Sequence, residues 1–152
     1  ELRRTSVSLT ESARAALETL NISFKDIRFP MTAVDNIGVR SILENRELST
    51  NSFFDVLGPA LSEEAARNAQ AAGGVVSSFV FPVIAGEEAI GSLIFSMSKP
   101  ISDVDSFEIE LMRSFVVTVG ISISNAKLFK KINLYREELE GNTEQLRKQN
   151  QS

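Results

Sequence analysis

The chain has 152 residues, of which 43% are hydrophobic and 24% charged, as expected for one globular domain with a substantial core. Sixteen basic against twenty acidic residues give a net charge of -4 with no basic run, so we expect no nucleic-acid partner. Cysteine and histidine are both absent, which excludes disulfides, thiolate nucleophiles, Cys/His zinc sites and His-ligated haem.

The hydropathy pattern contains no apolar run near the roughly 20 residues of a spanning helix. The N-terminus also lacks a charged segment followed by an apolar one, which a signal peptide needs. We therefore expect a soluble, cytoplasmic chain without direct membrane insertion, even if its parent protein is tethered to a membrane. Acid/base chemistry would fall to carboxylates or lysines with shifted pKa values, and we expect no enzymatic activity.

The first third of the chain predicts short elements. Residues 2–9 are polar and β-prone, which predicts a half-exposed strand. Ser8 and Glu11 have the spacing of a capping box, and apolar residues follow at helical intervals, so a helix is expected over residues 9–20. Apolar and polar residues alternate loosely over residues 22–31, which predicts an extended chain. A second helix is expected to begin near Asp35 as its N-cap.

An apolar cluster lies within residues 46–60, between loop and breaker signals, and includes Phe53, Phe54 and Leu57. Such a segment either covers a cavity or completes the core, and the sequence leaves both readings open. Residues 60–72 are rich in Ala, Glu and Gln, with Ser62 as a candidate N-cap, and Gly73 and Gly74 follow. This pattern predicts a third helix that ends at a glycine with positive φ.

Residues 75–84 and 88–97 are apolar and β-prone, and a short turn around Gly86 separates them, which predicts a β-hairpin. Phe79 and Phe81 alternate with smaller residues, so one face is expected to meet a core. Pro82 lacks an N–H donor and requires a bulge or an edge-like register. The candidate ligand-binding residues are the aromatic and aliphatic side chains of these two segments, Phe53, Phe54, Leu57, Phe79 and Phe81.

The segment after Ser102 is ambiguous, because residues 115–123 are rich in β-formers. Ser102 and Asp105 have N-cap spacing, apolar residues recur at three- and four-residue steps, and no proline follows Pro100. These features favour a helix. It is apolar on more than one face, so we expect it to contact its own sheet and a second partner.

Beyond residue 127 the apolar pattern narrows to a heptad spacing, at Leu128, Ile132, Tyr135, Leu139, Asn142 and Leu146. Alternating steps of four and three residues are those of d and a positions in a coiled coil. Asn142 at a d position would weaken the coil and help to fix its register. The alternative is a single solvated helix that frays after the domain.

Residues 75–132 resemble the C-terminal half of a GAF domain. The resemblance rests on the hairpin with Pro82 and Gly91, the connection from Lys99 to Asp105, and the exit through residues 123–129, Ile-Ser-Asn-Ala-Lys-Leu-Phe. It implies an α+β fold, with a profilin-like antiparallel sheet flanked by helices and a long C-terminal helix extending into a coiled coil. Residues 1–128 would form the sensor domain, and residues 129–152 a coiled-coil linker to an output domain outside this chain, such as a histidine kinase or diguanylate cyclase.

The chain departs from the family in three ways. The family's first helix and first strand have no counterpart here. In its cyclic-nucleotide signature Lys99 and Asp105 match, but Ser98, Ile101 and Ser106 replace Asn, Phe and Glu, which disfavours cyclic GMP and cyclic AMP. Tetrapyrrole attachment and methionine sulfoxide reduction, as known in the family, both need cysteines. The cofactor is therefore unknown.

The resulting expectation is a non-catalytic sensory domain of a bacterial signalling protein, such as a two-component system. It would bind an unidentified small molecule and relay its state through a homodimeric C-terminal helix. The relay residues are the apolar heptad positions Leu128, Ile132, Tyr135, Leu139 and Leu146. The alternative is a dimerisation spacer with a filled core and no ligand.

Overall fold

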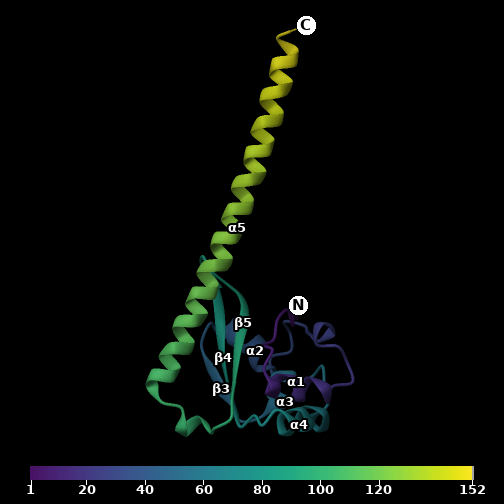
Figure 1. The fold of residues 1–152 in the computed structure, drawn as a ribbon, viewed down its shortest axis with the longest axis vertical. Coiled ribbons are helices and arrows are strands. Elements are labelled where there is room, and N and C mark those ends of the chain that lie inside the picture. The colour runs from purple at the N-terminus through teal and green to yellow at the C-terminus, as the bar shows by residue number, and fades with distance from the viewer. Residues whose placement is uncertain (152) are drawn as a thin grey trace.

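The structure is a computed structural model that describes residues 1–151. The fold has two small antiparallel sheets among short helices and one long C-terminal helix, which confirms the predicted α+β class. Figure 1 shows the larger sheet beside the short helices and the long helix that leaves the domain. The elements in chain order are β1 (Leu2–Arg3), α1 (Glu11–Glu18), η1 (Phe24–Asp26), β2 (Arg28–Phe29), α2 (Ile37–Glu44), β3 (Leu48–Thr50), α3 (Phe53–Leu57), α4 (Glu63–Ala72), β4 (Ser77–Ala85), β5 (Glu88–Met97), η2 (Ile101–Asp103) and α5 (Ser106–Gln149).

The hairpin β4–β5 is the centre of the fold and confirms the sequence prediction. It turns at Gly86, whose φ of 67° suits glycine. Pro82 itself stays in register opposite Ser92, and the register shifts one residue later, between Val83 and Ile84. Strand β3 pairs with β4 only opposite residues 78–80, so Pro82 lies beyond the end of β3 and interrupts no ladder on that side.

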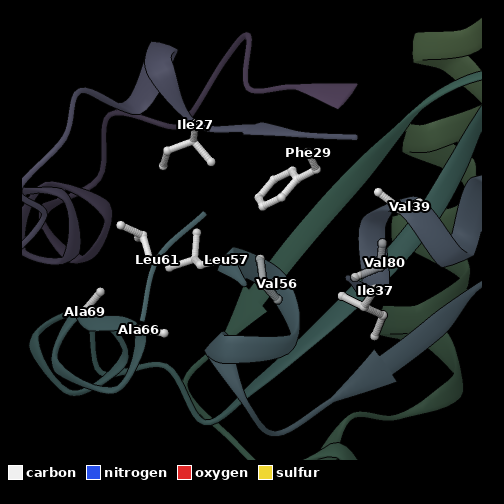
Figure 2. Close-up of a cluster of buried hydrophobic side chains, with 10 residues drawn as sticks. All are labelled: Ile27, Phe29, Ile37, Val39, Val56, Leu57, Leu61, Ala66, Ala69 and Val80. Atoms are coloured by element: carbon white, nitrogen blue, oxygen red, sulfur yellow. The ribbon is translucent and has the colours of Figure 1, made fainter. Parts of the chain in front are cut away.

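The first core lies on one face of the three-stranded sheet, between the sheet and the short helices. Figure 2 shows its ten buried side chains: Ile27, Phe29, Ile37, Val39, Val56, Leu57, Leu61, Ala66, Ala69 and Val80. They come from β2, α2, α3, α4 and β4 and from the connections between them. This core holds the N-terminal half of the chain against β4.

The N-terminal elements are shorter than predicted, and two N-caps were placed wrongly. The predicted strand over residues 2–9 shrinks to β1, which pairs only with β2. Thr10, and not Ser8, caps α1 by accepting a hydrogen bond from the backbone N–H of Ala13. Asn36, and not Asp35, caps α2, because its amide also donates to carbonyls of the α3 region and is buried there. Tertiary contacts therefore decided between neighbouring cap-forming residues.

Helix α4 matches its prediction closely, with Ser62 as N-cap. Gly74, the second glycine after the helix, takes the positive φ of 63°. The segment 46–60, predicted as a loop, contains β3 and the five-residue α3.

The second core lies on the other face of the sheet, under α5. Its buried residues are Phe79, Phe81, Val83, Val104, Met112 and Val116. Successive strand residues point to opposite faces, so β4 gives Phe79 and Phe81 to the second core and Val80 to the first. Strand β4 is thus the shared layer between the two cores.

Helix α5 is continuous over 44 residues and includes the β-prone stretch 115–123, which confirms the helix prediction. Burial of Met112 and Val116 against β4 outweighs the modest helix propensity of the β-branched residues. Asp105, rather than the predicted Ser102, caps the helix through a capping box with Glu108. The first half of α5 lies along the sheet and the second half extends away from the domain as a rod (Figure 1).

Candidate functional site

Helix α5 approaches β4 very closely at Gly120. A Cβ atom built on Gly120 would lie 2.1 Å from the carbonyl oxygen of Ile84, a distance that no side chain tolerates. Ile84 also lies next to the irregularity of the β4–β5 ladder, where the unpaired residue, Ile90, belongs to β5. A glycine inside a run of β-branched helix residues is a sequence signal for a close contact of this kind. The contact was not among the features predicted from the sequence.

The start of α5 is held by Lys99, which lies in the connection from β5. The Lys99 ammonium donates to both carboxylate oxygens of Glu108, at 2.6 and 2.7 Å. Glu108 also accepts from the backbone N–H of Asp105 at 3.0 Å. These hydrogen bonds, led by that from Lys99, lower the pKa of Glu108.

A second polar clamp joins α5 to the residue before β3. The Arg113 guanidinium makes two bonds to the Glu47 carboxylate, Nε to Oε2 at 3.0 Å and Nη2 to Oε1 at 2.6 Å. It also contacts Glu110 one turn earlier, and the bond to Glu47 is the main cause that raises the pKa of Arg113. Arg113 and Glu47 are 66 residues apart in the chain, and no sequence pattern predicts that they pair.

The five predicted relay residues lie on the rod and are all exposed. Leu128, Ile132, Tyr135, Leu139 and Leu146 have exposed fractions between 54% and 66%. With Asn142 they form what we call the rod stripe. A row of apolar side chains at a spacing of 3.5 residues, open to water, is a surface that a second helix covers in a coiled coil.

The five predicted ligand residues do not come together in the structure. Phe79 and Phe81 lie in the second core, with Phe81 edge-to-face against Phe95 at 5.7 Å. Leu57 is buried in the first core on the opposite face of the sheet, Phe53 packs against that core, and Phe54 is 38% exposed. As a ligand-binding set they stay a prediction.

Two surface depressions occur elsewhere. One is lined by residues 7–10 with Arg14, Leu17 and Glu18 of α1, and the other follows the last turns of α5 from Arg136 to Lys148 and includes Gln151 beyond the helix. None of the five predicted ligand residues lines either depression. Within residues 1–151, no group of three or more carboxylate side chains is placed to hold a metal ion.

The partly buried side chain of Arg4 is a polar feature beside the first core. Its Nη2 donates to the carbonyl oxygen of Val56 at 2.8 Å, and the group lies 5.4 Å from the Phe29 ring centroid. The buried Nε has no hydrogen-bond partner among the described residues. Burial lowers the pKa of Arg4 to about 10.

Comparison with known proteins gave no match, either to a family model or to a curated protein. None of the helices within residues 1–151 is both long and apolar enough to cross a membrane.

Proposed function

We propose that this chain is a non-catalytic regulatory domain of the GAF type, which forms a homodimer through α5 and relays its conformational state along that helix. The observation that carries the proposal is the two-sided character of α5. One side is fixed to β4 at Gly120, and the rod beyond it presents exposed apolar residues at coiled-coil spacing.

The dimer part of the proposal follows from the hydrophobic effect. Five large side chains more than half exposed on one stripe of each rod are costly in water, and a second rod would cover them at about 25 cal/mol per Å² of apolar surface. About three heptads are marginal for an isolated helix but are adequate once two helices pack together.

The relay part follows from the shared strand. Because β4 contributes Val80 to the first core and Phe79 and Phe81 to the second, a displacement of β4 from the first core reaches α5 directly. Two further contacts, Lys99 with Glu108 and Arg113 with Glu47, make α5 move with the sheet rather than slide over it. A ligand would act by binding one position of β4 better than another, and the shift is limited to that difference in affinity.

A second candidate is a ligand-free dimerisation spacer, the alternative that the sequence already left open. The filled first core supports it, because ten tightly buried side chains occupy the face of the sheet away from α5. The two candidates share the dimer and differ in whether the domain holds a small molecule.

Native mass spectrometry of the chain, purified without a denaturing step, tests both candidates. A dimer that carries a compound, released on denaturation, is the result expected for the sensor. A dimer without any retained compound, and without one after incubation with a cell extract of small metabolites, would favour the spacer. A monomer at every concentration would contradict both.

A further inference from the structure

The heptad positions of the rod stripe can be followed back along α5 across the domain, where three of them are apolar: Phe107, Leu111 and Ile121. Counting back from Leu128 in alternating steps of three and four residues reaches six positions, namely Asn125, Ile121, Thr118, Ser114, Leu111 and Phe107. We call these six the domain stripe. All six are exposed, and Phe107, at 68%, is the most exposed of its apolar members. The two stripes together form a single seam from residue 107 to residue 146.

The domain stripe lies on the side of α5 that faces away from the sheet. Val116, which is buried against β4, is nine residues from both Phe107 and Asn125. At about 3.6 residues per turn, nine residues are two and a half turns, so these side chains point in opposite directions. A helix laid on the seam would thus meet α5 alone, with the rest of the domain on the far side.

We propose that the occupant of this seam is a second copy of the chain, whose α5 pairs in parallel and in register from Phe107 to Leu146. The inference rests on the proposed dimer and adds its extent and orientation. In this register Asn125 falls at an a position and meets its own equivalent, a pairing that specifies two strands and a fixed alignment. The neighbouring Ile132 at a and Leu128 at d also favour two strands, whereas Ile121 at d does not.

The charged side chains beside the seam weakly favour an antiparallel orientation of the two helices. In the parallel register Lys131 at g faces Arg136 of the second copy at e, which is repulsive. An antiparallel register that pairs Asn125 with Asn142 would instead place Lys131 near Glu138. Exposed charge pairs of this kind change an equilibrium by only about twofold each.

Apolar coverage favours the parallel orientation more strongly. In that antiparallel register Thr118 lies opposite Gln149, the last residue of α5, so Phe107 and Leu111 stay uncovered in both copies. The parallel register covers Phe107 and Leu111 in both copies, which makes four side chains. Burying each half-exposed side chain of this size changes the dimer equilibrium by about fivefold. The parallel pairing therefore prevails.

Single-cysteine crosslinking tests this pairing, because the chain has no cysteine of its own. Ser114→Cys and Thr118→Cys probe the domain stripe, Leu139→Cys probes the rod stripe, and Lys127→Cys is an exposed control off the seam. Under mild oxidation of the full chain, we expect disulfide-linked dimers from the three seam variants and no more than background from Lys127→Cys.

The outcomes separate the inference from the proposed function. If Leu139→Cys crosslinks while Ser114→Cys and Thr118→Cys do not, the dimer stands and the extended seam is wrong. If no variant crosslinks, either alone or in a mixture of Leu139→Cys with Leu128→Cys, both are wrong. If Leu139→Cys crosslinks only when mixed with Leu128→Cys, the helices are antiparallel and the inference is overturned.

A charge reversal gives a second readout that does not depend on disulfide geometry. In the parallel seam, Lys131→Glu turns two repulsive contacts with Arg136 into attractive ones, so we expect the dimer dissociation constant to fall about three- to tenfold at low salt. In the antiparallel arrangement the same variant would face Glu138, and the dissociation constant would rise instead. A rise would overturn the inference.

Discussion

The Cα of Gly120 lies so close to the carbonyl oxygen of Ile84 that a Cβ at residue 120 would stand only 2.1 Å from that oxygen. Because the obstacle is backbone, it cannot rotate away as a side chain would. This contact fixes where α5 crosses β4. It also decides which side of the helix is left for a partner.

Gly120→Ala is expected to undock α5 from the sheet. The gain in helix propensity is about 1 kcal/mol, and the clash with β4 outweighs it, so we expect a net destabilisation of about 2 kcal/mol. Urea unfolding followed by far-UV circular dichroism measures it. The matched control is Gly141→Ala on the rod, where a Cβ meets nothing within 4 Å and helicity should rise. Equal effects of the two substitutions would contradict the proposed packing.

Asn36→Ala is expected to destabilise the domain by about 3 kcal/mol. Asn36 is 1% exposed, caps α2, and donates to the carbonyl oxygens of Val56 and Gly58 at 2.9 and 2.8 Å. The substitution removes the cap and leaves the Gly58 carbonyl without its bond. Thr10→Ala, which removes an exposed cap from α1, is the control and should cost only about 1 kcal/mol. Similar unfolding midpoints for the two variants would count against this role of Asn36.

Arg4→Met is expected to leave stability unchanged or to raise it by about 1 kcal/mol. The buried Arg4 guanidinium has no carboxylate partner in any ion pair of the described residues, and burial lowers its pKa to about 10. Below that pH the penalty for burying the charge is present in full. The substitution removes the hydrogen bond from Arg4 to the Val56 carbonyl oxygen, but that oxygen keeps its bond from Asn36. A fall in the thermal midpoint would show instead that the Arg4 charge is needed.

Acid is expected to loosen the start of α5 through Glu108. Its pKa is lowered from an ordinary 4.5, first by the hydrogen bond from Lys99. A carboxyl with a depressed folded pKa adds stability that is complete above its unfolded value and is lost as the pH falls through its folded value. The hydrogen-exchange protection of the first turns of α5, corrected for the intrinsic pH dependence of exchange, should therefore fall below about pH 4.5. Glu108→Gln should flatten this dependence, and Glu87→Gln, at an exposed turn residue, should leave it intact. A pH profile that Glu108→Gln does not alter would refute the role of the Lys99 contact.

The elements with strong local signals were predictable from the sequence. Helix α4 between Ser62 and Gly74, the hairpin around Gly86 and the helical state of residues 115–123 all followed from caps, turn residues and spacing. The caps at Thr10 and Asn36 were missed, because several cap-forming residues adjoin there and tertiary contacts choose among them.

The candidate site was less predictable than the fold. The rod stripe was found because heptad spacing is visible in one dimension. The five predicted ligand-binding residues do not lie together, because the sequence shows which residues are apolar but not which face of β4 each one meets. Phe79 and Leu57 consequently lie on opposite sides of the sheet. The clamp between Arg113 and Glu47 joins residues that only the folded topology brings together.

The mass of the assembly, measured by light scattering for a matched pair of variants, tests the central claim most directly. Leu139 lies on the seam and Leu134 does not, yet their exposed fractions of 66% and 57% are similar. We expect the wild-type chain and Leu134→Asp to have the mass of two chains, and Leu139→Asp to have the mass of one. One common mass for all three proteins would contradict pairing through the seam.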